Sequence, residues 1–272
     1  MFDRAKIVDE NFLLLIQNGN LPSSKNKLNL SDTNCSKEDL VSVFESQVIS
    51  RHIDLKARAL KNEGKCFYTI GSSGHEGNAV FGKVFQIQDM AFLHYRSAPL
   101  FIERSKKQNG TTPIYDLALS FMASSDDPIS GGRHKVIGSK ELNIPPQTST
   151  IASHLPKAVG TAFSIDHAKG LDISERCLND ESIVICSFGD ASANHASALS
   201  AFNTARLISN QGGHVPIVFI CEDNGLGISV PTQANWIEKN FKNQNNLKYI
   251  KTDGLDLIDL FNKTFIAEQN CR

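Results

Sequence analysis

The chain has 272 residues, of which 40% are hydrophobic and 21% charged, and its formal net charge is -1. This balance excludes a strongly basic nucleic-acid-binding protein, and the share of apolar residues excludes a disordered chain. No apolar run reaches the length of about 18 residues that a membrane-spanning helix needs, so neither nucleic acid nor a membrane is an expected partner.

The first 36 residues are expected to form an N-terminal extension that is partly flexible. The stretch from Asn18 to Cys35 is rich in Asn, Ser and Lys, contains Pro22 and shows no helical period. The chain starts with no signal-peptide pattern, and its six cysteines form no C-x-x-C pair. We therefore expect reduced thiols and a cytoplasmic protein.

Helical patterns and short apolar runs alternate from Ser36 onward. Ser36 with Asp39 resembles a capping box, and Gly64 is a plausible end for the helix that follows. One side of this helix is expected to be apolar, with Leu40, Val43, Phe44, Val48, Ile53, Leu55 and Leu60. Later patterns predict helices over 75–85, 99–107, 114–124 and 151–169, an extended piece over 91–95 and a long loop over 125–150.

The clearest unit lies between residues 182 and 230. Apolar runs over 182–188 and 216–221 read as buried strands, and a helical pattern over 193–209 separates them. Such a unit predicts a parallel crossover, hence an α/β fold with a parallel sheet flanked by helices. A third strand over 248–252 and a helix over 255–268 are expected next, and since a sheet would normally return after that helix, the domain of residues 37–272 is expected to be incomplete at its C-terminus.

Polar residues follow both predicted strands. Asp190 comes directly after the first strand, and Asn224 comes shortly after the second. The carboxyl ends of neighbouring parallel strands open on one edge, where α/β sheets bind their ligands. Oxygen ligands there suit Mg²⁺, and a helix starting near Ala193 favours an anion, so the pattern predicts a metal-bound diphosphate. The alternative is that these residues only cap strand ends; no P-loop or dinucleotide fingerprint is present.

The segment GDASANHASALSAFNTARLISNQGGHVPIVFICEDNGLGIS resembles the thiamine diphosphate motif. The match is closest to the alpha chain of the decarboxylating component of 2-oxo acid dehydrogenase complexes, of branched-chain or pyruvate type. Four further segments agree in order: Gly74 to Gly77, Leu93 to Arg96, Gly131 to Glu141 and Thr148 to Gly160. The resemblance runs from about residue 37 to the end and implies the diphosphate-side domain of a thiamine diphosphate-binding fold.

The resemblance implies roles for individual residues. Asp190 and Asn224 would bind Mg²⁺ through their side chains and Leu226 through its backbone carbonyl. Tyr95 and Arg96 would bind the diphosphate, Gly189 opens the motif and Ala191 would offer its backbone N–H. Ile151 would hold the cofactor bent, and Ser149 with Ser153 would form the K⁺ site of some family members.

Each of these residues also has a structural interpretation. Tyr95 is otherwise a core aromatic residue, Arg96 part of a salt bridge and Ile151 a core residue. His75 either contacts substrate or caps its helix. His134 either faces substrate from the long loop or is solvated. These two histidines are the candidate catalytic residues.

The sequence departs from the family pattern in four places. Ala191 replaces the second motif glycine, Asp223 replaces the first asparagine of a pair, and His154 stands where some relatives have glutamine. The histidine-bearing loop of the family is expected shortly beyond Arg272.

The activity that the resemblance implies is oxidative decarboxylation of a 2-oxo acid with transfer of the acyl group to a lipoyl-bearing acyltransferase. A beta chain or beta region of a heterotetramer would supply the glutamate that activates the cofactor, so this chain alone is expected to lack normal turnover. Two alternatives stay open: an acetoin-type or transketolase-like enzyme, and a non-catalytic assembly subunit. Intact Asp190, Asn224, Tyr95 and Arg96 argue against the second.

Overall fold

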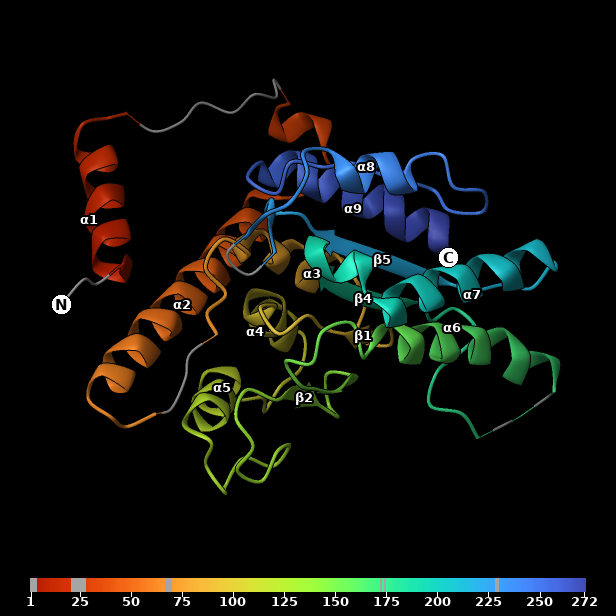
Figure 1. Cartoon of the computed structure of the whole chain (residues 1–272), viewed down its shortest axis with the longest axis horizontal. Helices are drawn as coiled ribbons and strands as arrows, with labels where there is room; N and C mark the ends of the chain where they lie inside the picture. The colour runs from red at the N-terminus through yellow and green to blue at the C-terminus, as the bar shows by residue number, and fades with distance from the viewer. Residues whose placement is uncertain (1–3, 21–27, 67–69, 172, 174, 228–229) are drawn as a thin grey trace.

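A computed structural model describes residues 4–20, 28–66, 70–171, 173, 175–227 and 230–272 (Figure 1). The helices are α1 (Arg4–Gln17), α2 (Lys37–Asn62), α3 (Ala79–Val84), α4 (Ala98–Ser105), α5 (Pro113–Met122), α6 (Leu155–Gly170), α7 (Ala196–Asn210), α8 (Trp236–Phe241) and α9 (Leu257–Cys271). The strands are β1 (Met90–Phe92), β2 (Ile137–Ser139), β3 (Ile144–Gln147), β4 (Val184–Gly189), β5 (Ile217–Glu222), β6 (Leu226–Gly227) and β7 (Val230–Pro231). Three single 3-10 turns, η1 (Leu30–Asp32), η2 (Glu76–Asn78) and η3 (Asp190–Asn194), complete the described elements.

The main sheet has the order β1-β4-β5, and both pairings are parallel. The predicted α/β class and the crossover from β4 through α7 to β5 are confirmed. The predicted third strand over 248–252 is wrong, because that segment has no strand structure and the third position belongs to β1. Its sequence, KYIKT, carries lysines that a strand covered on both faces does not tolerate.

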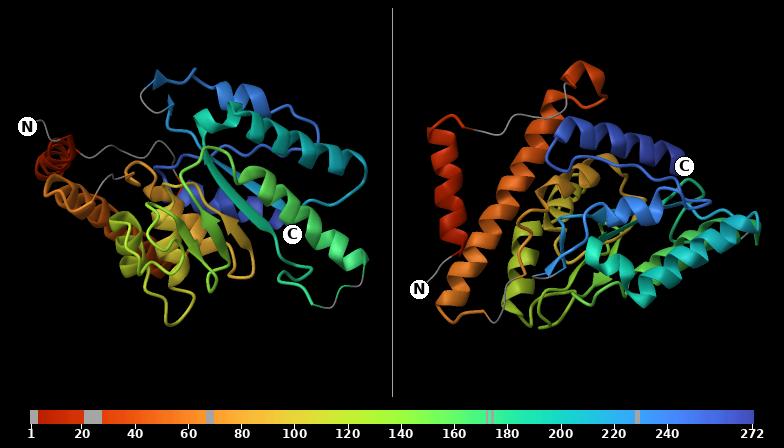
Figure 2. Two further views of the ribbon diagram at one scale, coloured as in Figure 1. Left: turned by 60° about the horizontal axis from the view of Figure 1, so that its bottom comes forward. Right: turned by 45° about the horizontal axis from the view of Figure 1, so that its top comes forward.

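Alternate residues of β4 enter two different cores. Val184, Cys186 and Phe188 pack with the apolar faces of α6 and α7. Ile185, with Ile183 just before the strand, packs on the opposite face with residues of α4. Figure 2 shows α6 and α7 side by side along one face of the sheet. The sheet is thus the middle layer, as its near-continuous apolar strands require.

Helix α2 begins as predicted, but the face that it buries is the predicted one only in part. Ser36 and Asp39 exchange hydrogen bonds of 3.0 Å in a complete capping box. Phe44 and Val48 are exposed, which contradicts the predicted apolar side. Val43, one of the predicted residues, is buried, and the other buried residues of the helix are Ser46, Ser50, Asp54 and Ala57. Small and polar residues face inward because the buried carboxylate of Glu103 on α4 accepts hydrogen bonds from the Ser42 and Ser46 hydroxyls.

The long loop predicted over 125–150 contains a short antiparallel pair, β2 with β3. Gly138 allows this pairing, since a Cβ there would lie 2.9 Å from Cα of Pro146. The predicted helix over 151–169 begins later, at Leu155, where Pro156 occupies the first turn that suits proline. Residues 151–154 form a turn in which Ala152 adopts a left-handed backbone with φ 57°.

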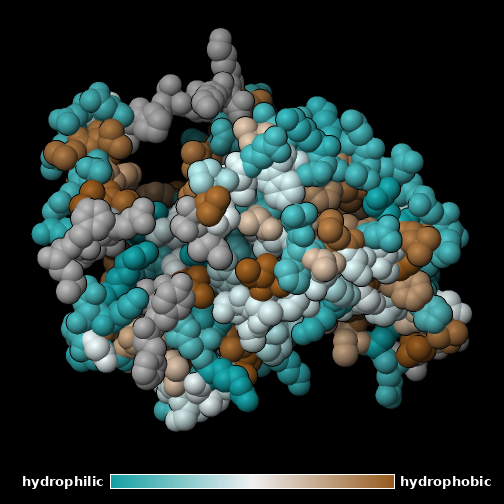
Figure 3. Space-filling model, in the orientation of Figure 1, coloured by the Kyte–Doolittle hydropathy of each residue, from teal (hydrophilic) through white to brown (hydrophobic). Residues whose placement is uncertain are grey.

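Helix α1 lies in the N-terminal extension, where the sequence pattern assigned no element. It stands apart from the body of the chain in Figures 1 and 2, and its side chains from Lys6 onward are exposed. Figure 3 shows apolar side chains over this helix. No helix among the described residues combines the length and hydropathy of a membrane span.

Candidate functional site

The carboxyl ends of β4 and β5 meet at one edge of the sheet. Their parallel register pairs Gly189 with Glu222, the last residue of each strand. Asp190 and the segment from Asp223 to Leu226 therefore leave the sheet on the same side. The sequence predicted this convergence.

Asp190 is almost fully buried, with 1% of its surface exposed. Its Oδ2 atom accepts a hydrogen bond of 2.7 Å from the Thr232 hydroxyl. Partial burial and the neighbouring Asp190 carboxylate raise the pKa of Asp223. Two carboxylates close together at a strand end make an electronegative position that suits a cation.

Asn224 and Leu226 form the turn that follows β5. Oδ1 of Asn224 accepts a hydrogen bond of 3.0 Å from the backbone N–H of Leu226, and Gly225 between them has a φ of 70°. A Cβ at Gly227 would lie 3.1 Å from Cβ of Ala191, so β6 packs closely on η3. The predicted metal-binding residues thus belong to two segments in contact, and all their candidate ligand atoms are oxygens.

The turn before α7 differs from the prediction. The helix begins at Ala196 rather than near Ala193, and Nδ1 of His195 accepts from the N–H of Ser197. The 3-10 turn η3 occupies the sheet edge instead. Ala191, in this turn, is exposed and available to a ligand.

Tyr95 and Arg96 follow β1 and are half-buried. Nη1 of Arg96 donates a hydrogen bond of 2.5 Å to the carbonyl oxygen of Gly71, and its guanidinium carbon lies 5.3 Å from the centroid of the Tyr95 ring. Within the described part of the chain no carboxylate lies within ion-pair distance of Arg96. The salt-bridge interpretation of Arg96 is therefore not supported, and its charge is open to an anion.

The turn that holds Arg96 is anchored by Asp54 of α2. Oδ2 of Asp54 accepts hydrogen bonds from the N–H of Ser72 at 2.6 Å and from the hydroxyl of Ser73 at 3.3 Å. A Cβ at Gly71 would lie 2.9 Å from the same oxygen, so a larger residue there would displace the Asp54 carboxylate. Burial raises the pKa of Asp54, and the charge of nearby Lys135 opposes that shift.

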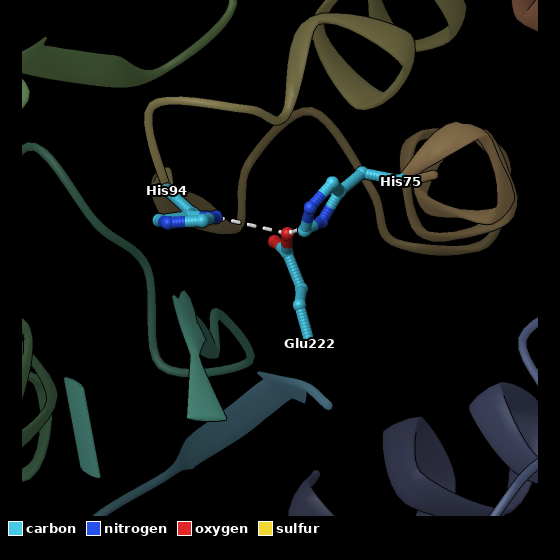
Figure 4. Close-up of side chains that lie close together, drawn as sticks. All are labelled: His75, His94 and Glu222. Atoms are coloured by element: carbon cyan, nitrogen blue, oxygen red, sulfur yellow. Dashed lines mark hydrogen bonds and ion pairs between the residues drawn. The ribbon is translucent and has the colours of Figure 1, made fainter. Parts of the chain in front are cut away.

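A buried carboxylate, Glu222, joins His75 and His94 (Figure 4). Its Oε2 atom accepts from Nδ1 of His75 and, at 2.9 Å, from Nδ1 of His94. Burial alone would raise the pKa of Glu222, but the charge of His94 and the hydrogen bonds from both histidines outweigh it and lower the pKa. His75 is thus tied to the end of β5 rather than merely capping its helix.

The network extends to β4 and α6. The Ser97 hydroxyl lies 3.1 Å from Oε1 of Glu222 and 3.1 Å from the hydroxyl of Ser187. Nε2 of His154 donates a hydrogen bond of 2.7 Å to the carbonyl oxygen of Ser187. Burial lowers the pKa of His154 to about 4, which keeps its ring neutral.

Ser149 and Ile151 lie in the turn between β3 and α6. Ile151 is 41% exposed, so it is not the core residue of the alternative interpretation. Hydroxyl groups gather here, with 2.9 Å between the Thr148 and Thr150 hydroxyl oxygens, and the Ser153 hydroxyl donates to the Thr150 carbonyl at 3.3 Å. This oxygen-rich turn suits a monovalent cation by its donor type, and the K⁺ site stays a prediction.

His134 lies half-buried in the loop before β2. The neighbouring Lys135 is buried and adopts a left-handed backbone with φ 56°. Sequence reasoning gave no role to Glu222, His94 or Lys135. For Glu222 there was one signal, a charged residue placed directly at the end of the buried run PIVFIC.

Comparisons with known proteins agree with the geometry. The family model described as dehydrogenase E1 component matches residues 45–272. The mitochondrial 2-oxoisovalerate dehydrogenase subunit alpha of Mus musculus is 27% identical over 238 residues, which is 86% of this chain and 49% of that protein. The Caenorhabditis elegans protein of the same name is 26% identical over 240 residues, 86% of this chain and 51% of that protein. The Homo sapiens protein is 26% identical over 242 residues, with shares of 86% and 49%. This chain spans about half the length of the curated relatives it matches.

Proposed function

The chain belongs to the dehydrogenase E1 component family, and on that premise we propose that it is the alpha part of an alpha/beta enzyme. The enzyme decarboxylates a 2-oxo acid oxidatively and passes the acyl group to a lipoyl group, using thiamine diphosphate and Mg²⁺. The three relatives described above are each named 2-oxoisovalerate dehydrogenase subunit alpha, which favours a branched-chain 2-oxo acid over pyruvate as the substrate.

The observation that carries the proposal is the register of β4 with β5, which brings Asp190 and the Asn224 turn to one sheet edge. Asp190 and Asn224 would hold Mg²⁺ by side-chain oxygens, and Leu226 by its carbonyl oxygen. The residues fit this ion, because Mg²⁺ takes hard oxygen ligands and completes its shell with phosphate and water. None of these proposed ligand atoms is a sulfur or an imidazole nitrogen.

Thiamine diphosphate supplies an electron sink for the loss of carbon dioxide from a 2-oxo acid. Around it, Arg96 and Tyr95 orient the diphosphate, and Gly189 and Ala191 give it access to a backbone N–H. Ile151 offers an exposed apolar side chain that would support the cofactor. Ser149 belongs to the turn that positions Ile151.

His75 is the histidine best placed to handle a proton, because Glu222 holds its ring at the sheet edge. His134, the other candidate, keeps the role of a substrate contact from the loop before β2. Both assignments are tested by the kinetic effect of replacing each histidine.

The proposal includes partners. A beta chain or beta region would complete the site, in the heterotetramer that the resemblance implies, and a lipoyl-bearing acyltransferase would accept the acyl group. The apolar side chains of Ile151, Leu226 and Val230 are exposed around the sheet edge. Exposed apolar side chains in one region support the proposal that a partner covers this face. We therefore expect no normal turnover from this chain by itself. The division at residue 36 and a cytoplasmic location stay predictions; the relatives carry the word mitochondrial in their names.

The decisive experiment is calorimetric titration of thiamine diphosphate into the chain, with Mg²⁺ and with EDTA, alone and with the beta partner. Asp190→Ala is the test variant, and Asp126→Ala, at an exposed aspartate of the long loop, is the control. We expect binding that requires Mg²⁺, that the control retains and that Asp190→Ala abolishes.

Absence of binding in the presence of the partner would contradict the proposed function and favour a non-catalytic assembly subunit. Binding without metal, unaffected by Asp190→Ala, would remove the metal role from Asp190. If the enzyme turned over acetoin but no branched-chain 2-oxo acid, the acetoin-type activity would replace the proposed one. If it turned over only a sugar phosphate, the transketolase-like activity would replace it.

A further inference from the structure

Lys135, in the loop before β2, is buried, with 8% of its surface exposed. In the described part of the chain its ammonium group has no hydrogen-bond or ion-pair partner, and the hydrogen bond that Lys135 donates there comes from its backbone N–H. Lysine is almost never buried without a partner, because removing an ammonium group from water costs free energy that only a hydrogen bond or a counter-charge offsets. The buried, unpaired charge of Lys135 therefore indicates a site for an anion.

The backbone around Lys135 is fixed in an uncommon conformation. Its φ is 56°, in the left-handed region that residues other than glycine rarely adopt. Gly131 and Gly132, just before it, have positive φ as well, of 55° and 104°. Ser120 of α5 holds the chain on both sides: its carbonyl oxygen accepts from the N–H of Lys135 at 3.1 Å, and its hydroxyl donates to the carbonyl oxygen of Val136 at 2.9 Å. A strained backbone that its surroundings maintain in this way is typical of ligand-binding sites.

Two charged residues that contact the turn at Gly71 also act on Lys135. Oδ2 of Asp54 would lie 2.9 Å from a Cβ at Gly71, and Nη1 of Arg96 donates to the Gly71 carbonyl oxygen. Burial lowers the pKa of Lys135, the negative charge of Asp54 opposes that shift, and the positive charge of Arg96 adds to it. Asp54 thus favours the charged form of Lys135 without forming an ion pair with it. The net charge of the three side chains is positive, which attracts an anion.

The proposed function brings two anions to the enzyme, the diphosphate of the cofactor and the carboxylate of the 2-oxo acid. Mg²⁺ and Arg96 would balance charge on the diphosphate, whereas none of the residues assigned so far pairs with the carboxylate. A lysine suits that group, because its ammonium is a compact single charge with three N–H donors. His134, the residue before Lys135, is already a candidate substrate contact from the same loop.

We propose that Lys135 is a specificity-determining residue that binds the carboxylate of the 2-oxo acid. A charge-assisted hydrogen bond between its ammonium group and a carboxylate oxygen is strong in a buried site. A neutral molecule of the same shape gains little from Lys135, so the lysine selects acids over uncharged compounds with the same carbon skeleton. The inference rests on the proposed function for the identity of the ligand, and the experiment below separates the two.

The first measurement compares the binding of isovalerate with that of isovaleramide. Isovalerate is a branched carboxylate with no oxo group, so it binds without being decarboxylated, and the amide has the same shape but no charge. Calorimetric titration into the chain assembled with its beta partner, loaded with thiamine diphosphate and Mg²⁺, gives the affinity for each. We expect the wild type to bind isovalerate about 10- to 100-fold more tightly than isovaleramide.

Lys135→Met, which keeps the length of the side chain and removes its charge, should abolish this preference and leave the affinity for isovaleramide and for thiamine diphosphate unchanged. Lys135→Arg keeps the charge and should retain most of the preference. Lys140→Met, which removes the charge of an exposed lysine just after β2, is the control and should bind both ligands as the wild type does. A merely structural role of Lys135 would instead weaken the binding of both ligands in Lys135→Met.

The second measurement is steady-state kinetics of the same assembly with a branched-chain 2-oxo acid. If Lys135 binds the carboxylate, Lys135→Met should raise KM by about 10- to 100-fold, and kcat should change much less. Lys135→Arg should restore most of the loss in KM.

Three results would overturn the inference: equal binding of isovalerate and isovaleramide by the wild type, an undiminished preference for isovalerate in Lys135→Met, or a loss of thiamine diphosphate affinity alone, which would assign Lys135 to the diphosphate. A wild-type assembly that binds no cofactor would contradict the proposed function instead, and the two ligands titrated without cofactor would still decide the role of Lys135. If Lys135→Met fails to fold, Lys135→Gln, which is neutral but keeps a polar end, takes its place.

Discussion

The hydroxyl of Thr232 donates a hydrogen bond of 2.7 Å to Oδ2 of Asp190, across 42 residues of sequence. This bond ties the end of β4 to the residue that follows the β6–β7 pair. Neither composition nor spacing singles out Thr232, whose importance follows from its partner.

Replacing Thr232 by valine should weaken Mg²⁺-dependent cofactor binding while leaving the fold intact. Valine has nearly the same shape but no hydroxyl, so the Asp190 carboxylate loses the bond that orients it. Loss of an outer partner of this kind costs between about 10- and 100-fold in metal affinity. Titration of Mg²⁺ at saturating thiamine diphosphate measures the change. Thr264→Val, which removes a buried threonine hydroxyl on α9, is the control, and equal affinities in the two variants would refute the role of Thr232.

His154 should make the fold less stable in mild acid. Burial lowers its folded pKa to about 4, whereas an unfolded histidine titrates near 6.5. Between these values the unfolded chain binds a proton that the folded chain does not, so stability falls as the pH decreases from about 6.5 to about 4. Below that range the full loss, about 3 kcal/mol, has been reached.

Urea unfolding of the wild type and of His154→Gln, at pH 7 and at pH 5, isolates this contribution. Glutamine keeps an N–H donor for the Ser187 carbonyl and does not titrate. The stability of the variant relative to the wild type should therefore increase as the pH falls. His52→Gln, at an exposed position of α2, should show no such trend. A constant difference between His154→Gln and wild type would mean that the buried ring is not the acid-sensitive group.

Two glycine-to-alanine replacements in helices should change stability in opposite directions. A Cβ at Gly82 of α3 would lie 2.5 Å from the Leu100 carbonyl oxygen of α4, so Gly82→Ala forces two packed helices apart. Overpacking of this kind costs about 1–3 kcal/mol. Gly160 on α6 has no neighbouring atom within 4 Å of such a Cβ, so Gly160→Ala should stabilise the chain by about 0.5–1 kcal/mol. Thermal unfolding of the two variants and the wild type measures both changes in stability. An increase in the stability of Gly82→Ala would contradict the close packing of α3 on α4.

Ile151→Ala should affect the cofactor and spare the fold. Because the side chain is 41% exposed, its truncation should change the free energy of unfolding by less than about 0.5 kcal/mol. Leu155→Ala, four residues later at a fully buried position of α6, should cost about 2–5 kcal/mol instead. Cofactor affinity should fall in Ile151→Ala. A loss of stability in Ile151→Ala as large as in Leu155→Ala would return Ile151 to the core interpretation.

The sequence predicted those parts of the fold whose signal is local. The strands β4 and β5 are continuous apolar runs separated by one helical pattern. Few topologies other than a parallel crossover fit that combination. The capping box at Ser36 was readable because both partners lie within four residues. The same strand pattern placed Asp190 and Asn224 at one edge of the sheet, and the register of the two strands confirms it.

Features made by distant pairs could not be predicted. Strand β1 has three residues and no period of its own, so its place beside β4 depends on tertiary contacts. The inward face of α2 was misjudged because Glu103, on another helix, draws Ser42 and Ser46 toward it. The Glu222 network joins segments up to 147 residues apart, and no spacing rule links them.

The strand order also has a consequence for how the chain acquires its structure. Strand β1 comes from the first third of the sequence, yet its only main-sheet neighbour among the described residues is β4, which starts at Val184. During synthesis, helices α2 to α5 are therefore made well before β4, and the sheet that covers them cannot form until β4 has been made. Such long-range pairing makes folding slow. Until β4 is present, the apolar side chains of these helices stay exposed, and chaperones bind surfaces of this kind. The segment that bears Tyr95 and Arg96 thus reaches its final position only after β4 has been synthesised.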